Sequence, residues 1–142
     1  MMVAILKKQL DEIRVEEPVV QYLSEIWNLI GTGKLLLAPN LDTYAKDLPR
    51  YGGYIEDGVY MLKKDETHVA VISAFNARGD YFTASIGDIA KELKKEGLTR
   101  YDADECLKRA SSKIKGRPRM LALIRSRCEK RLEDGRNGKS SE

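Results

Sequence analysis

The chain has 142 residues, with 25 lysines and arginines, 22 aspartates and glutamates, one histidine and two cysteines. Hydrophobic residues make up 42% and charged residues 33% of the chain, a composition that is typical of globular domains and excludes an intrinsically disordered protein. No apolar run approaches the roughly 18 residues of a membrane-spanning helix, and the first residues lack the features of a secretory signal peptide. We therefore expect a cytoplasmic protein with no membrane partner.

The histidine and cysteine counts limit the catalytic sites that the chain can build. His68, Cys106 and Cys128 cannot supply a His-rich zinc site, and one histidine leaves little for a Ser-His-Asp triad. The segment 31–34 resembles part of a phosphate-binding loop, but that pattern requires glycine where the chain has Asn28.

An acidic cluster contains Asp102, Asp104 and Glu105. A divalent-metal site would need a further carboxylate on a rigid sheet, so we interpret these residues as loop and capping residues. We predict that the protein is not an enzyme and that it holds no metal and no cofactor.

The net charge of +3 conceals an uneven distribution of charge along the chain. Residues 1–90 have a net charge of −4 and residues 91–142 a net charge of +7. Between residues 107 and 131 there are ten basic side chains and one acidic side chain, Glu129. This segregation indicates that the C-terminal third contacts a polyanion such as nucleic acid.

Two helices are predicted before residue 34. Residues 1–14 have apolar side chains at a spacing of three and four, and we place the segment 1–16 at the periphery of the domain. The second helix begins at Pro18, since proline is favoured in the first turn, and glycines at positions 31 and 33 end it. Its apolar stripe includes Trp27, which we interpret as a core residue.

The middle of the chain predicts a short strand over residues 34–38, a loop or weak helical turn over residues 40–50, and a β-hairpin over residues 53–62. Asp57-Gly58 divides the β-prone segment of the hairpin. This dipeptide favours the tight turn whose two central residues need positive φ.

Two further helices follow the hairpin. The first covers residues 64–78 and is expected to bury Val69, Ile72 and Phe75. The second is capped by Ser85 and closed by Gly97, with its apolar residues on one side.

The C-terminal part predicts two strands, 110–114 and 120–125, around the basic turn 115–118. The tail over residues 133–142 is expected to be disordered, which leaves a single domain over residues 1–132. The order of helix, helix and basic hairpin is that of a winged helix-turn-helix. We therefore predict the α+β class: a winged helix-turn-helix with additional N-terminal helices and an extra β-hairpin.

In such a fold the hairpin lays cations along the phosphate backbone while a helix faces a groove. The exposed positions of the helix after Ser85 carry acidic and basic side chains together, and none of them is an Asn, Gln or Arg that could read a base edge. We therefore expect phosphate contacts with low sequence specificity, in which Arg117 and Arg119 have the largest part. The predicted DNA-binding residues are Lys91, Lys95, Lys108, Arg109, Lys113, Lys115, Arg117 and Arg119.

The segment 115–119, Lys-Gly-Arg-Pro-Arg, also resembles the core of an AT-hook, an extended peptide that enters narrow minor grooves. It has lysine where the first arginine is expected, and its flanks favour strands. A basic turn at the end of the hairpin is therefore the alternative interpretation.

Residues 17–124 resemble the C-terminal region of helicase- or primase-like ATPases of phages and integrative elements. The resemblance lies in the helix that ends Ile-Gly-Thr-Gly-Lys, the Gly-Tyr-Ile-Glu-Asp-Gly-Val-Tyr-Met-Leu hairpin, the helix that ends Glu-Gly-Leu, and the Lys-Gly-Arg-Pro-Arg turn. It implies an accessory winged-helix module beside a separate motor, whose ATP-binding residues have no counterpart in this chain.

These observations predict a non-catalytic DNA-binding domain that serves DNA replication of a mobile genetic element or phage, with a helicase or primase ATPase as a partner. Two alternatives remain open. The acidic first two-thirds and the N-terminal helix fit a protein-docking module of the same machinery. A stand-alone winged-helix transcriptional regulator is the third possibility.

Overall fold

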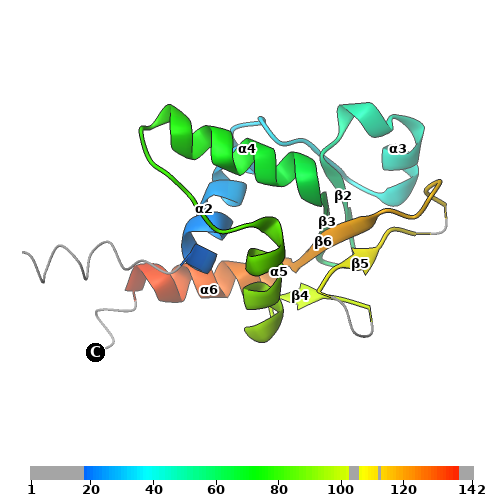
Figure 1. The fold of residues 1–142 in the computed structure, drawn as a ribbon. Helices are drawn as coiled ribbons and strands as arrows, with labels where there is room; N and C mark the ends of the chain where they lie inside the picture. Colours follow the sequence, from blue (N-terminus) through cyan, green and yellow to red (C-terminus); the bar gives the residue numbers. More distant parts are fainter. Residues whose placement is uncertain (1–17, 103–105, 112, 138–142) are drawn as a thin grey trace, which may run out of the picture.

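The computed structural model describes residues 18–102, 106–111 and 113–137 (Figure 1). The predicted N-terminal helix over residues 1–16 and the last residues, 138–142, lie outside this part of the chain. The described elements, in chain order, are the helix α2 (Pro18–Gly31), the strand β1 (Leu37–Ala38), the helix α3 (Leu41–Lys46), a 3-10 turn (Leu48–Arg50), the strands β2 (Gly53–Glu56) and β3 (Val59–Lys63), the helices α4 (Lys64–Ala77) and α5 (Ile86–Lys95), the strands β4 (Thr99–Arg100), β5 (Lys108–Arg109) and β6 (Arg119–Ile124), and the helix α6 (Arg125–Asn137).

The strands form one mixed sheet in the order β1-β2-β3-β6-β4, and β5 also pairs with β6. β1 runs parallel to β2, whereas the other pairs are antiparallel. The long pairing of β3 with β6 joins residues 59–63 to residues 120–124 and forms the centre of the sheet. The mixed α+β class is thus confirmed.

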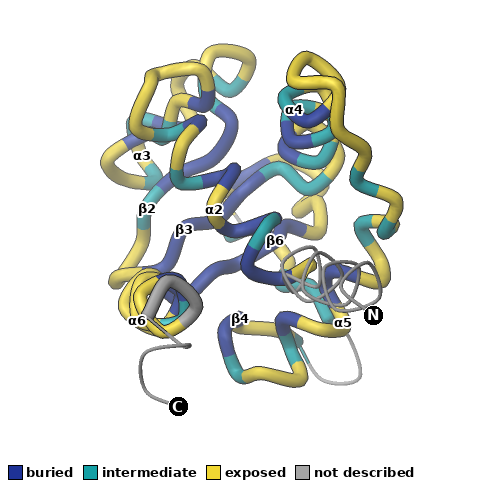
Figure 2. Tube along the Cα trace, turned by 90° about the vertical axis from the view of Figure 1, so that its left-hand side faces the viewer, coloured by how far each residue is buried: buried dark blue, intermediate teal, exposed yellow. Residues whose placement is uncertain are grey.

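Each face of the sheet has its own apolar core, because side chains alternate along β3 and β6. Leu62, Leu121 and Leu123 pack against α2, α4, α5 and α6. Met61 and Ala122 point the other way, toward α3 and the segment 110–114. Figure 2 shows that buried positions run through β3 and β6 and along the inner sides of the helices.

The β2–β3 hairpin confirms the prediction made from Asp57-Gly58. Asp57 has a φ of 51° and Gly58 a φ of 75°, as the tight hairpin turn requires. Four residue pairs join the two strands, from Gly53 opposite Leu62 to Glu56 opposite Val59.

The helices α4 and α5 also form where they were predicted, with one correction to the buried face of α4. Its inner side consists of Thr67, Val71 and Phe75, whereas Val69 is 63% exposed. Phe75 is buried as predicted and Ile72 is half-buried, so the predicted face was rotated relative to the observed one. Ser85 caps α5 as expected, since its Oγ accepts a hydrogen bond of 3.1 Å from the backbone N–H of Asp88.

The predicted strand 110–114 is wrong. The strand β5 is shorter and earlier, and residues 110–111 and 113–118 belong to a loop that turns through Gly116 and Arg117, with φ values of 80° and 40°. The side chains of Ala110 and Ile114 are buried with Tyr44 of α3 on the second face of the sheet, and this burial draws the segment out of the hairpin. The turn also excludes the extended conformation of an AT-hook at this point in the structure.

The tail predicted to be disordered from residue 133 is helical as far as Asn137, because α6 continues directly from β6. Cys128 and Leu132, four residues apart, lie on one side of the helix and are buried in the first core. A helix here was not predicted. Its two buried side chains pack it against the sheet.

The burial of Cys128 leads to a prediction about thiol reactivity. Burial raises the pKa of the Cys128 thiol to about 12, so almost no thiolate is present at pH 8. Cys106 is only half-buried. We expect one thiol per native chain to react rapidly with a thiol reagent at pH 8, and both to react in urea. Rapid labelling of a native Cys106→Ser variant would contradict this assignment.

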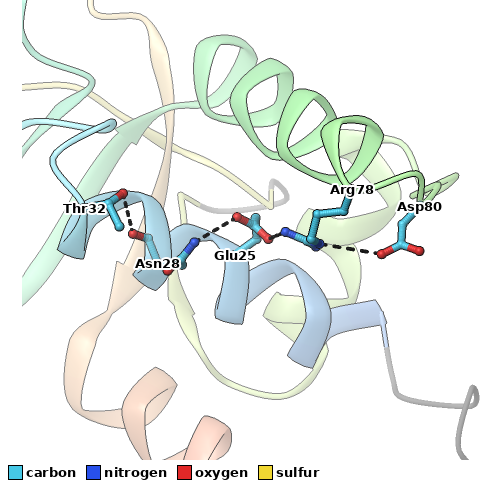
Figure 3. A network of polar contacts seen from close by, with 5 residues as sticks. All are labelled: Glu25, Asn28, Thr32, Arg78 and Asp80. Carbon is cyan, nitrogen blue, oxygen red and sulfur yellow. Dashed lines mark hydrogen bonds and ion pairs between the residues drawn. The ribbon is translucent and has the colours of Figure 1, made fainter.

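A polar network joins α2 to the end of α4 (Figure 3). The Glu25 carboxylate is only 6% exposed and accepts a hydrogen bond of 2.7 Å from Nη1 of Arg78. Asn28 donates to the other carboxylate oxygen at 3.4 Å, and Asp80 forms a longer ion pair of 3.6 Å with Arg78. The network compensates the negative charge of Glu25, the one acidic side chain that is buried in the described part of the chain.

Candidate nucleic-acid interface

The helix α5 separates its acidic and basic side chains onto two flanks. At about 100° per residue, Lys94, Lys91 and Lys95 follow one another around the helix, although Asp88 and Glu92 each lie three residues from one of these lysines. Asp88, Glu92 and Glu96 follow one another at four-residue spacing on the neighbouring flank. The exposed positions that looked mixed in the sequence are therefore ordered in the structure.

Two contacts show which way each flank faces. The ammonium of Lys94 lies 4.4 Å from the ring centroid of Tyr101, which directly follows β4, so the basic flank faces the edge of the sheet. On the other side, Nε of Arg131 in α6 lies 2.7 Å from Oε1 of Glu96, so the acidic flank faces α6. Figures 1 and 2 both show α5 beside β4.

The edge of the sheet continues from Tyr101 to two arginines. The carboxylate of Asp102 accepts a hydrogen bond of 2.8 Å from the backbone N–H of Arg109. Arg109 lies directly opposite Arg119 in the pairing of β5 with β6, and both are exposed.

We group the lysines of α5 with the exposed residues at this edge of the sheet and call them the basic strip. By the alternation of side chains along β6, Arg119 projects to the same face as Leu121, the face that α5 covers. Tyr101 connects the helix to the arginines, since its ring contacts Lys94 and its neighbour Asp102 contacts Arg109. The basic strip consists of Lys91, Lys94, Lys95, Tyr101, Arg109 and Arg119.

Comparison with known proteins adds no relative. No family model, curated protein or solved structure matches this chain. The resemblance to helicase- or primase-like ATPases therefore stays a prediction, and the interface has to be argued from its own chemistry.

The other predicted DNA-binding residues lie away from the basic strip. Lys108 points to the opposite face of the sheet, as does its neighbour in the pairing, Met120, and it forms an ion pair of 3.8 Å with Asp102. Lys113 forms an ion pair of 3.3 Å with Asp42 of α3. Strand alternation thus divides cations that are close in sequence between two faces.

The last two predicted residues, Lys115 and Arg117, are exposed in the loop that connects β5 to β6. The Nε of Arg117 donates a hydrogen bond of 2.9 Å to the carbonyl oxygen of Ala110. This hydrogen bond joins the two sides of the loop. Arg117 therefore has a structural role that the sequence did not reveal.

Sequence reasoning did not select Lys94 or Tyr101 for this interface. Lys94 was grouped with the mixed surface of α5, and Tyr101 lies in a short segment between predicted elements. The available signal was an aromatic residue within a basic stretch, but only the contact of 4.4 Å shows that the two side chains meet.

Asp102 is the one member of the predicted acidic cluster that lies among the described residues. Asp102 accepts a hydrogen bond from the backbone N–H of Arg109 and forms an ion pair with Lys108. Asp104 and Glu105 lie outside the described residues. Among residues 18–102, 106–111 and 113–137, no three His, Cys, Asp or Glu side chains are close enough to hold a metal ion. No helix in these ranges has the length and apolar character that a membrane crossing requires.

His68 is half-buried and lies in α4 rather than in the interface. Its Nδ1 is 3.0 Å from the hydroxyl oxygen of Tyr22, and the two rings stack at 5.7 Å. Burial lowers the pKa of His68 below its ordinary value, which favours the neutral ring at neutral pH. These contacts belong to the packing of α2 against α4.

Proposed function

We propose that the chain is a non-catalytic module that binds DNA through the basic strip with low sequence specificity. The observation that carries the proposal is the contact of Lys94 with Tyr101, which places the lysine-bearing side of α5 beside the edge of the sheet where Arg109 and Arg119 lie opposite each other. Lysine and arginine bind the phosphate backbone by charge, which gives affinity without reading sequence.

We further propose that α4, α5 and the β5–β6 hairpin act together as a winged helix-turn-helix. The order of two helices followed by a basic hairpin supports this arrangement, with α5 in the position of the recognition helix. The loop of the hairpin is packed beside α3 through Ala110 and Ile114, so the base of the hairpin supplies the contacts in this proposal.

The biological setting is proposed from the resemblance described above. We propose that the module accompanies a helicase- or primase-like ATPase in the replication of a phage or integrative element. A DNA-binding module of this kind increases the local concentration of the motor on its substrate, which explains why it needs no catalytic residues of its own.

A salt titration of DNA affinity tests the proposed interface. Fluorescence anisotropy with labelled single-stranded and duplex DNA is measured for the parent chain and for two double variants, Lys91→Ala/Lys95→Ala and Arg109→Ala/Arg119→Ala. Each lost phosphate contact is expected to reduce the slope of log affinity against log salt by about 1. The variants should therefore bind more weakly and with a shallower salt dependence.

The matched control is Lys46→Ala/Lys113→Ala, which removes the same number of charges from the α3 side of the molecule. It is expected to keep the salt slope and nearly all of the affinity of the parent chain. If the control and the strip variants lose affinity equally, then net charge rather than the basic strip determines binding. Absence of binding at low salt would rule out the proposed function.

A further inference from the structure

We infer that the basic strip takes single-stranded DNA in preference to duplex DNA, an inference that rests on the proposed function and specifies its substrate. It follows from what each flank of α5 offers to a phosphate backbone, and from the exposed aromatic ring between the helix and the hairpin.

A helix that enters the major groove of a duplex meets phosphates on both sides. The groove is about 12 Å wide and a helix with its side chains is about 10–12 Å across, so the two backbones lie along the two flanks. A duplex-binding helix of this type therefore benefits from cations, or at least from uncharged groups, on both flanks.

The flank of α5 that faces α6 does not meet this requirement. It carries Asp88, Glu92 and Glu96, and Asp88 lies in the first turn, where helices of this class contact bases. The cations on this side come from α6 and contact the residues that end α5. Arg131 forms an ion pair with Glu96, and Arg127 donates a hydrogen bond of 2.9 Å to the carbonyl oxygen of Gly97. A second phosphate backbone would meet carboxylates here, and α6 itself stands at the C-terminal end of the helix.

The basic flank of α5, which faces the edge of the sheet, suits one backbone and its bases. Lys91 and Lys95 are exposed and can bind successive phosphates, while Tyr101 is 47% exposed and has the Lys94 ammonium against its ring. Proteins that hold single strands combine cations along the backbone with aromatic rings on which unpaired bases stack. In a duplex the bases are already stacked on one another, so Tyr101 would gain no base contact.

The test compares the full chain and its variants on fluorescein-labelled oligothymidine of about 20 nucleotides and on a duplex of the same length, at the same low salt. We expect the single strand to bind at least about tenfold more tightly. Tyr101→Ala should weaken binding of the single strand about tenfold and change duplex binding less than about twofold. Tyr101→Phe should retain the affinity of the parent chain, since the ring is kept.

Tyr81→Ala is the matched control, because Tyr81 is also an exposed tyrosine, at 85%, but precedes α5 and lies outside the basic strip. It should leave both affinities unchanged. Thermal unfolding of each variant establishes that the fold is retained. Equal or tighter binding of the duplex, or an equal loss on both substrates in Tyr101→Ala, would overturn the preference for single strands and leave the proposed function standing. Absence of binding to either DNA would overturn both.

Discussion

Replacement of Gly53 by alanine is expected to destabilise the protein by more than about 3 kcal/mol, because β2 and β3 approach closely at this position. A Cβ atom on Gly53 would overlap the carbonyl oxygen of Met61 and lie 3.0 Å from the Cα of Leu62. These neighbours are backbone atoms in the strand that pairs with β6, so relief of the clash would displace the centre of the sheet.

Urea denaturation followed by circular dichroism measures this effect, and Gly31→Ala is the matched control. A Cβ on Gly31, the last residue of α2, would meet no atom within 4 Å. Alanine is the better helix former, so Gly31→Ala should be neutral or stabilise by up to about 1 kcal/mol. A Gly53→Ala variant that unfolds at the same urea concentration as the parent chain would show that the two strands are not this close.

Replacement of Arg78 by alanine is expected to cost about 3 kcal/mol, because it leaves the buried Glu25 carboxylate without its charged partner. The two side chains contribute unequally, since Glu25 is 6% exposed and Arg78 is 47% exposed. Glu25→Gln leaves an arginine that water can still solvate, so it should cost less than Arg78→Ala. The loss in Arg78→Ala includes the packing of the guanidinium over the Phe75 ring, at 4.7 Å.

The control for this prediction removes the exposed partner of the same arginine. Asp80 lies 3.6 Å from Nε of Arg78 and is 63% exposed, and exposed ion pairs contribute between about 0 and 1 kcal/mol. Asp80→Ala should therefore shift the unfolding midpoint very little. If Asp80→Ala and Arg78→Ala destabilise equally, the buried carboxylate is not the reason that Arg78 matters.

Elements that local chemistry specifies could be predicted from the sequence. The Asp57-Gly58 turn forms because both residues tolerate positive φ, and the two ends of α5 form because Ser85 caps one and Gly97, with a φ of 74°, closes the other. Each of these features depends on a few adjacent residues. A single sequence contains all the information that they need.

Elements that depend on distant partners could not be predicted in the same way. The sequence around Ala110 and Ile114 looks like a strand, but its conformation is determined by a small core whose other members come from β1, α3, β2, β3 and β6. The helix α6 likewise forms because Cys128 and Leu132 enter a core built from α2, β3, α4, α5 and β6. No local pattern reports the presence of such a partner.

The candidate interface likewise combines features that the sequence specifies with features that only the tertiary structure specifies. The amino-acid sequence by itself determined that basic side chains gather in the last third of the chain, that the helix after Ser85 has no residues suited to base reading, and where both ends of that helix lie. The tertiary structure decided which of the cations act together: the register of β5 with β6 opposes Arg109 and Arg119, and strand alternation sends Lys108 to the other face. Charge is a property of each residue, whereas a binding surface requires several residues to face the same way, and that direction is fixed only when the sheet and helices pack.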